Sequence, residues 1–371
     1  MAGPLRQPID ITSLTNYITT HVPQIQTPIT LAQFGFGQSN PTYLLTSSTG
    51  QKCVLRKKPP GKLVSASAHK VEREYRILRA LEGTSIPVPR TYCLCTDESV
   101  LGTPFYIMEF LDGRIFEDAS FPGVTAEERR VMWREAMRVL ARFHSLDPRK
   151  IGLEGYGRSG GFYARQLETW RGLARAQGAV VDVETNEAVG DVPGTEKMIA
   201  FFSDERFQPA DRATLIHGDF KIDNLVFHKT EPRIIGILDW EMSTIGHPLA
   251  DIANVVHPWT VNALSPRAAR EIGLPHDIAY ISGLPSVAQC VAWYAEEAGW
   301  DPAAELRWAE AFCLFRLSII YQGIAARYAA RQATSTKARE LGRAMYPCAE
   351  LAERVIQEIE DKDKDTDRAR L

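Results

Sequence analysis

The sequence predicts an α+β fold in two lobes. The first, over residues 1–110, is a small antiparallel β lobe with one main helix, and the second, over residues 111–371, is larger and mainly helical. Short apolar and β-branched runs separated by glycine and proline turns fill the first part. After Leu111, apolar residues recur at the three- and four-residue spacing of helices. A chain of 371 residues is long enough for two such lobes.

In the small lobe, Asp10 or Thr12 is expected to cap a first helix. Strands are expected near residues 29–34, 42–46, 52–56, 90–95 and 104–110, with the main helix at about 66–81.

In the large lobe, we expect helices near residues 126–144, 163–177, 196–202 and several from 247 to 354. The acidic, turn-rich stretch 179–194 is expected to be a mobile loop. The charged stretch 358–368 is expected to fray into solvent.

Composition indicates which kinds of partner and which cellular compartment to expect. The net charge of −3 gives no indication of a nucleic-acid partner. The longest apolar region, residues 311–326, is interrupted by Arg316 and Gln322, so no membrane span is expected. Six cysteines without zinc spacing, and an N-terminus without an apolar segment, predict a cytoplasmic protein. The terminal Ala369-Arg370-Leu371 is close to a peroxisomal address, which is the alternative.

Two short motifs, at residues 217–224 and 237–240, carry the strongest chemical signal. Two apolar runs with a turn between them separate the motifs and predict a hairpin. The start of one antiparallel strand lies beside the end of its partner, so Asn224 and Asp239 should meet, with Asp219 on the preceding loop. Oxygen ligands of this kind suit Mg²⁺ that also binds a polyphosphate. The alternative is that three polar residues cap a hairpin by chance.

The spacing Asp-x-x-x-x-Asn followed by an Asp after the second strand is the pattern of kinases. Asp219 is therefore the candidate catalytic residue, which orients the acceptor hydroxyl and accepts its proton. Asn224 and Asp239 are the candidate Mg²⁺ ligands. His217 and Asp251 are expected to support the structure of the loop.

Kinases also place a basic residue on the third strand, paired with a helix glutamate. Arg56 fits this strand position, with Lys57 and Lys58 as competitors. Glu74 shares the apolar face of its helix and should pair with Arg56, whereas Glu72 points away. A bridge from Glu74 to a neighbouring basic residue on its own helix is the alternative.

A glycine-containing turn between two strands could bring backbone N–H groups to phosphate oxygens. Gly35, Gly37 and Asn40 are its candidate nucleotide-binding residues, although Asn40 replaces the third glycine of the usual pattern. An ordinary glycine hairpin is the alternative. Backbone groups near Glu109 are expected to read the adenine edge.

The His-Gly-Asp form of the first motif resembles the aminoglycoside-phosphotransferase-like small-molecule kinases, which have a bilobal protein-kinase-like fold. Longer stretches resemble the branch fused to certain acyl-CoA dehydrogenases, namely residues 54–63, 71–78, 151–157, 217–228, 315–316 and 322–324. The resemblance implies an ATP- and Mg²⁺-dependent phosphotransferase acting on a hydroxyl of a small molecule. The branch implies hydroxyacyl-CoA as a possible acceptor. The alternative function is a nucleotide-binding regulatory module without turnover.

The acceptor pocket is expected in the large lobe. Its candidate walls are residues 155–163, the stretch 179–194, and helices around Trp259 and residues 315–321. Apart from the acidic stretch 179–194, these walls are mainly aromatic and apolar. We therefore expect an uncharged or anionic acceptor with an apolar portion rather than a polycation.

Overall fold

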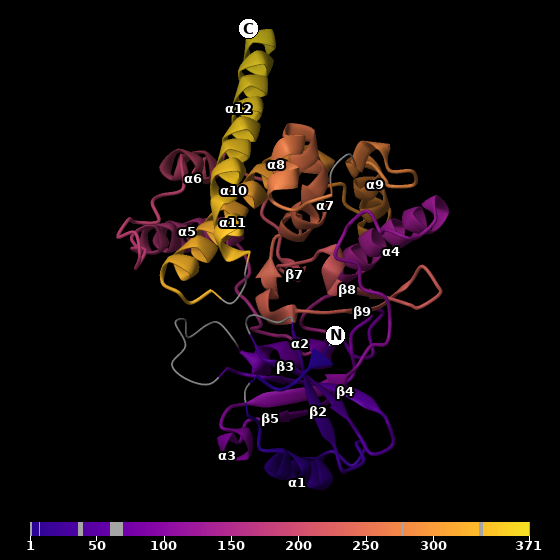
Figure 1. The fold of residues 1–371 in the computed structure, drawn as a ribbon. Coiled ribbons are helices and arrows are strands. Elements are labelled where there is room, and N and C mark those ends of the chain that lie inside the picture. Colours follow the sequence, from indigo (N-terminus) through magenta and orange to yellow (C-terminus); the bar gives the residue numbers. More distant parts are fainter. Residues whose placement is uncertain are drawn as a thin grey trace. The chain divides into compact units, whose positions relative to one another are not determined.

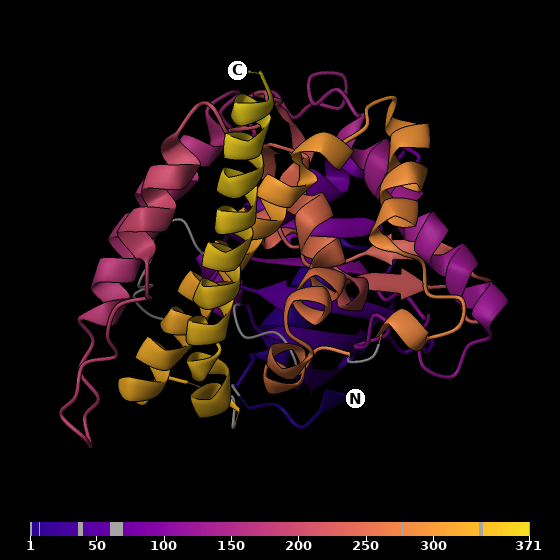
Figure 2. The same ribbon diagram turned by 90° about the horizontal axis from the view of Figure 1, so that it is seen from above.

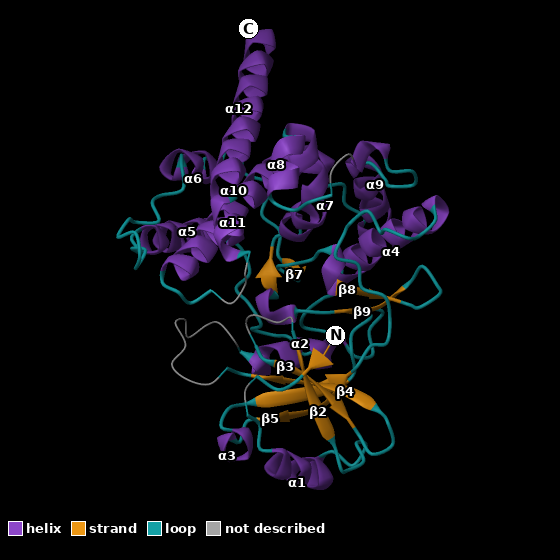
Figure 3. Cartoon of the chain, viewed as in Figure 1, coloured by secondary structure: helices purple, strands orange, loops and turns teal. Residues whose placement is uncertain are grey.

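The computed structural model describes residues 2–6, 8–35, 40–59, 70–275, 278–333 and 337–370. The chain packs as two compact units. Unit 1 comprises Met1–Ile115, Asp147–Glu154 and Asn224–Ser243, and unit 2 comprises Phe116–Leu146, Gly155–Asp223 and Thr244–Leu371. Strands predominate in unit 1 and helices in unit 2 (Figure 3). The predicted α+β class is therefore confirmed.

Unit 1 is built on an antiparallel sheet (Figure 1). Its strand order is β1-β2-β3-β4-β6-β5. Its strands are β1 (Ala2–Gly3), β2 (Thr30–Phe34), β3 (Thr42–Thr46), β4 (Lys52–Lys57), β5 (Thr91–Cys95) and β6 (Phe105–Glu109). The helices of unit 1 are α1 (Ile11–His21), α2 (Val71–Leu81) and α3 (Glu98–Leu101). Asp10 caps α1, accepting from the backbone N–H of Ser13. Of the expected main helix, residues 66–69 lie outside the described residues.

The two faces of this sheet contact different helices because side chains alternate along a strand. Tyr17 on α1 packs edge-on against Phe105, and Tyr75 on α2 packs edge-on against Tyr106. The residues of α1 and the Phe105 face form one apolar core. The α2 face instead receives a buried carboxylate, Glu74.

Unit 1 also contains the motif hairpin, β8 (Leu225–Phe227) and β9 (Ile234–Ile237), followed by the short helix η2 (Trp240–Met242). Gly113 packs against this hairpin so closely that an added Cβ would lie 2.3 Å from the carbonyl oxygen of Phe227. Only glycine fits there.

Unit 2 is helical apart from the two-stranded pair β7 (Thr214–Ile216) and β10 (Thr244–Gly246). Its principal helices are α4 (Ala126–His144), α5 (Phe162–Gly178), α6 (Thr195–Ser203), α7 (Leu249–Leu264), α9 (Val287–Ala298), α10 (Ala303–Ala329) and α12 (Met345–Arg370). Shorter helices are η1 (Ile222–Asn224), α8 (Pro266–Glu271), η3 (Ile278–Tyr280) and α11 (Ala338–Arg343). The last residue of η1, Asn224, begins the third segment of unit 1. In Figure 2, α12 (yellow) runs beside α10 (orange).

Helix α10 is the central helix of unit 2. Within the described residues it alone is long and apolar enough to cross a membrane, and 67% of its most apolar window is buried inside the protein. Its aromatic side chains pack on those of α5 and α6, as in the core helix of a globular domain.

One expectation for unit 2 was wrong. The stretch 358–368 does not fray, because α12 continues to Arg370. Pairs one helical turn apart, such as Asp361 with Lys364 at 3.2 Å, support its last turns. The stretch 179–194 forms turns and irregular structure, as expected of a loop. A bridge between Val181 and Ala188 and the ion pairs of Arg331 tie it down.

Candidate active site

Arg56 organises a polar cluster in unit 1. It lies on β4, and its Nε is 2.9 Å from Oε2 of Glu74 on α2. The expected ion pair is therefore present. Glu74 is 1% exposed and, besides this ion pair, accepts two hydrogen bonds, from the Tyr106 hydroxyl at 2.8 Å and from the Asn40 amide at 3.0 Å. Lys57, the competitor on the opposite face of the strand, is buried, and burial lowers its pKa.

The protonation of Glu74 depends on opposing effects. Burial raises its pKa to about 7, while Arg56 and the Tyr106 hydroxyl act in the opposite direction by favouring the carboxylate. Burial also disfavours the charge on Arg56, but the neighbouring carboxylates outweigh this, with Glu74 first, and raise the pKa of the guanidinium. Arg56 is thus a permanent cation whose principal partner titrates near neutrality.

Arg56 also contacts two carboxylates that follow the hairpin. Its guanidinium is 3.0 Å from Asp239 and 3.4 Å from Glu241. One cation therefore contacts three carboxylates, counting Glu74. Sequence reasoning missed Glu241, which is two residues after Asp239.

The hairpin brings Asn224 and Asp239 to the same end, as expected. Leu225 pairs with Ile237, and the N–H of Leu238 donates to the carbonyl of Asn224 at 2.8 Å. Asp239 has a positive φ of 64°, which is uncommon for a residue other than glycine and is often found at functional sites.

The donor set around Asp239 fits Mg²⁺ with a bound polyphosphate. One carboxylate and one amide are oxygen ligands of the kind that Mg²⁺ takes, and the remaining positions would belong to phosphate and water. Across the described residues, no group of three or more His, Cys, Asp or Glu side chains could hold a metal by itself.

Asp219 lies in unit 2, on the loop after β7. Asp251 at the start of α7 fixes this loop by accepting from the backbone N–H groups of His217 at 2.6 Å and Gly218 at 2.8 Å. His144 Nε2 lies 3.1 Å from the same carboxylate. Burial opposes ionisation of Asp251, but these partners outweigh it and lower its pKa. The expected supporting role of Asp251 is confirmed.

Further contacts hold the two sides of the loop. Arg316 on α10 donates to the carbonyl of Gly218 at 2.6 Å, and Asn254 on α7 donates to the carbonyl of Phe220 at 3.0 Å. His217 is fully buried, and its ring accepts from the N–H of Asp219 at 3.2 Å. The loop backbone before Asp219 is thus held on several sides.

Lys221 is the cation beside Asp219. Its Nζ lies 3.5 Å from Asp219 Oδ2 and 3.2 Å from Asp223 Oδ2. Burial works against its charge, but the two carboxylates outweigh burial and raise its pKa. Sequence reasoning missed Lys221. The closeness in sequence of Lys221 to Asp219 and Asp223, two residues away on either side, was the available signal.

The expected nucleotide-binding turn is only partly described. Gly35 directly follows β2, whereas Gly37 lies outside the described residues. Asn40 is buried and directs its amide to Glu74. Glu109 ends β6, and its carboxylate accepts from the N–H of Arg90 at 3.2 Å.

Some of the expected acceptor walls are core instead. Phe315 is fully buried and packs against Trp170 and Phe202. Trp259 is only half-buried, and it packs edge-on against Trp133 on α4. The stretch 179–194, in contrast, borders a cavity of about 290 Å³ within unit 2.

The chain belongs to the phosphotransferase enzyme family (APH), whose model matches residues 30–284. Relatives include probable acyl-CoA dehydrogenase IBR3 of Arabidopsis thaliana, 42% identical over 84% of this chain and 38% of that protein. Acyl-CoA dehydrogenase family member 11 of Rattus norvegicus is 36% identical over 86% of this chain and 40% of that protein. This chain therefore corresponds to well under half the length of these two relatives.

Solved structures agree with this membership. A protein of Ralstonia eutropha, described as a candidate aminoglycoside phosphotransferase, has a TM-score of 0.79 and 35% identity, covering 95% of this chain and 99% of that one. The streptomycin–ATP complex of the aminoglycoside phosphotransferase APH(2″)-IIa has a TM-score of 0.59 at 15% identity, covering 93% of this chain and 99% of that one. The second likeness establishes the fold, so the predicted kinase-like fold is confirmed.

Proposed function

We propose that this phosphotransferase transfers the γ-phosphoryl group of ATP to a hydroxyl of a small molecule, with Mg²⁺. The observation that carries the proposal is the network of Arg56 with Glu74 and Asp239, at 2.9 and 3.0 Å. A strand cation held by a helix glutamate and facing the acid after the hairpin is the arrangement by which kinases bind nucleotide phosphates. The ATP complex of a protein with the same fold supports ATP as the donor.

In this proposal each residue has one task. Asp219 orients the acceptor hydroxyl and accepts its proton as the new P–O bond forms and the bond to ADP breaks. Lys221, beside Asp219, supplies positive charge for the transferred group. Arg56 contacts the nucleotide phosphates. Asn224 and Asp239 would hold Mg²⁺, which supplies further positive charge to the phosphate oxygens.

The nucleotide contacts proposed for Gly35, Gly37 and the backbone near Glu109 complete the donor side. The proposed division is that residues 1–110 bind nucleotide and residues 111–371 carry the catalytic and acceptor groups. For the acceptor we propose a hydroxyacyl thioester. The names of the relatives, which are acyl-CoA dehydrogenases, support an acyl compound rather than an aminoglycoside.

The test is an ATP-consumption screen of the full chain with hydroxyacyl-CoA, choline-like amines, aminoglycosides and sugars. We expect turnover with hydroxyacyl-CoA, and a loss of about 10²–10⁴-fold in kcat for Asp219→Asn, with Mg·ATP affinity retained. Asp147→Asn, an exchange of the same kind in an exposed turn, is the matched control. Turnover of an aminoglycoside alone would reject the acceptor, and full activity of Asp219→Asn would reject its role. Mg·ATP binding without turnover of any acceptor would indicate a regulatory module.

A further inference from the structure

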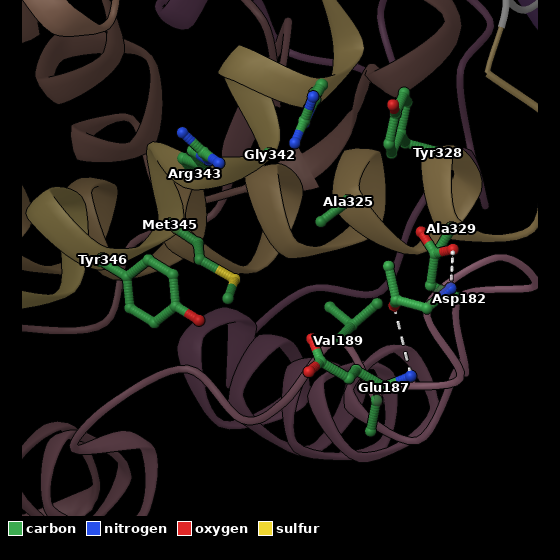
Figure 4. A pocket seen from close by; sticks show the side chains of 13 residues that line it. Asp182, Glu187, Val189, Ala325, Tyr328, Ala329, Gly342, Arg343, Met345 and Tyr346 are labelled. Carbon is green, nitrogen blue, oxygen red and sulfur yellow. Dashed lines mark hydrogen bonds between the residues drawn. The ribbon is translucent and has the colours of Figure 1, made fainter.

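A cavity of about 290 Å³ in unit 2 has no role in the chemistry proposed above (Figure 4). Residues of the 182–189 segment form one wall, and α10, α11 and the start of α12 form the others. Its lining combines apolar side chains with two phenols and two guanidinium groups. The residues that matter below are Val189, Met345, Tyr328, Tyr346, Arg339 and Arg343.

The wall formed by the 182–189 segment is held in place. Arg331 binds Asp182 at 3.1 Å and Glu184 at 2.8 Å. The N–H of Val183 donates to the carbonyl of Ala329 on α10 at 3.3 Å. A ligand therefore does not have to order this wall when it binds, which favours affinity.

The charge of the cavity favours an anion. Arg339 and Arg343 are exposed and four residues apart, so they share one face of α11. Within the described part of the chain, neither forms an ion pair with a carboxylate. Arg331 is shared between Asp182 and Glu184, and Glu187 is the other lining carboxylate. Figure 4 shows Glu187 apart from Arg343. The α11 wall of the cavity is therefore cationic, and the carboxylates belong to the 182–189 segment.

Helix α10 connects the cavity to the catalytic loop. Arg316 on this helix donates to the carbonyl of Gly218, next to Asp219. Ala325, the first α10 residue of the cavity, comes nine residues later, and Tyr328 comes twelve residues later. At a rise of 1.5 Å per residue these lie about 13 and 18 Å further along the helix.

We propose that this cavity binds the anionic end of an elongated acceptor. That end carries a phosphate or carboxylate group about 13 Å or more from the hydroxyl that is phosphorylated, and Arg339 and Arg343 recognise it. The apolar portion lies against Val189 and Met345. The proposal rests on the proposed function, because it takes Asp219 as the site of transfer. It excludes polycationic acceptors, which two free guanidinium groups would repel.

The test compares two probes by titration calorimetry on the full chain. One is a hydroxyacyl-CoA, whose phosphates lie far from the acyl hydroxyl, and the other is the same acyl group on pantetheine, which lacks them. We expect Arg339→Gln with Arg343→Gln to weaken CoA-thioester binding at least about tenfold and to reduce its salt dependence. Pantetheine-thioester and Mg·ATP affinities should not change. Arg267→Gln with Arg270→Gln on α8 is the matched control.

Inorganic pyrophosphate tests whether the cavity binds the anionic group of the acceptor or a free inorganic anion. The proposal is supported if pyrophosphate competes with the CoA thioester in the wild type and this competition is lost in the variant with both Arg339→Gln and Arg343→Gln. Equal thioester affinity in this variant and the wild type would overturn it, as would pyrophosphate binding that leaves thioester affinity unchanged. Because binding is measured without turnover, a chain that holds the thioester at α11 but never consumes ATP contradicts the proposed function instead.

Discussion

Glu74 is a single residue whose burial and ion-pair partner could both be predicted from the sequence. Its apolar helix face predicted that it points inward, and an inward carboxylate needs partners. The sequence indicated Arg56 as one partner. It did not indicate the Tyr106 hydroxyl or the Asn40 amide, because their approach depends on strand register and on packing between distant segments.

The pKa of Glu74 predicts a pH dependence of nucleotide binding. The ionised form holds Arg56, and burial raises this pKa to about 7, so lowering the pH from 8 to 6 protonates Glu74 in the folded chain. We expect Mg·ATP affinity to fall severalfold over this range. Glu74→Gln should bind weakly with little pH dependence, and Glu72→Gln, on the same helix, is the matched control. The same pH profile in wild type and Glu74→Gln would contradict the assignment.

The sign of the linked stability effect follows from the same shift. The folded pKa of Glu74, about 7, is above its ordinary value of 4.5. Between these values the folded chain keeps a proton that the unfolded chain has lost. The contribution of Glu74 to the free energy of unfolding therefore falls as pH rises from about 4.5 to 7. Chemical denaturation of wild type and Glu74→Gln across this range measures the difference.

The β8–β9 hairpin is the element whose position the sequence predicted best. Its two apolar strands and turn were enough to bring Asn224 near Asp239, because antiparallel pairing fixes which ends meet. The surroundings of Asp219 could be predicted less well. Asp251 was expected to support the loop, but the contact from Arg316 depends on how α10 packs in unit 2. Packing of that kind leaves no local signal in the sequence.

The hairpin carries a prediction about metal. Asp239 provides the carboxylate beside Asn224, so Asp239→Ala should weaken Mg²⁺-dependent ATP binding more than ATP binding without metal. Because Arg56 also loses a partner, metal-free binding serves as the internal reference. Titration of ATP across a series of Mg²⁺ concentrations measures the ATP affinity with and without the metal. Glu231→Ala, in the exposed hairpin turn, is the control. Identical Mg²⁺ dependence in Asp239→Ala and wild type would remove Asp239 from the metal site.

At the scale of the whole molecule, composition and pattern predicted the fold class and the family, because both depend on periodicity and on motifs that are local in sequence. The packing of unit 1 could not be predicted from them. It gathers residues 1–115, 147–154 and 224–243 into one unit, so segments more than 100 residues apart share a core. The acceptor side was predicted least well, since aromatic residues expected to line a pocket, Phe315 above all, are core residues of unit 2.

Nucleotide that binds only the folded chain should raise the free energy of unfolding and the thermal midpoint. A ligand that binds only the folded state at 100 times its Kd adds about 2.7 kcal/mol to the free energy of unfolding. We expect Mg·ATP to raise the thermal midpoint of the wild type, and Arg56→Ala to lose most of this rise because phosphate contacts and the hold on Asp239 are lost together. For each variant, the thermal midpoint with Mg·ATP is compared with the midpoint of the same variant without it. The destabilisation caused by removing the ion-pair partner of Glu74 is present in both measurements and therefore cancels. Arg79→Ala, an exposed exchange on α2, should keep the full rise. An equal rise in Arg56→Ala and wild type would mean that Arg56 does not contact the nucleotide.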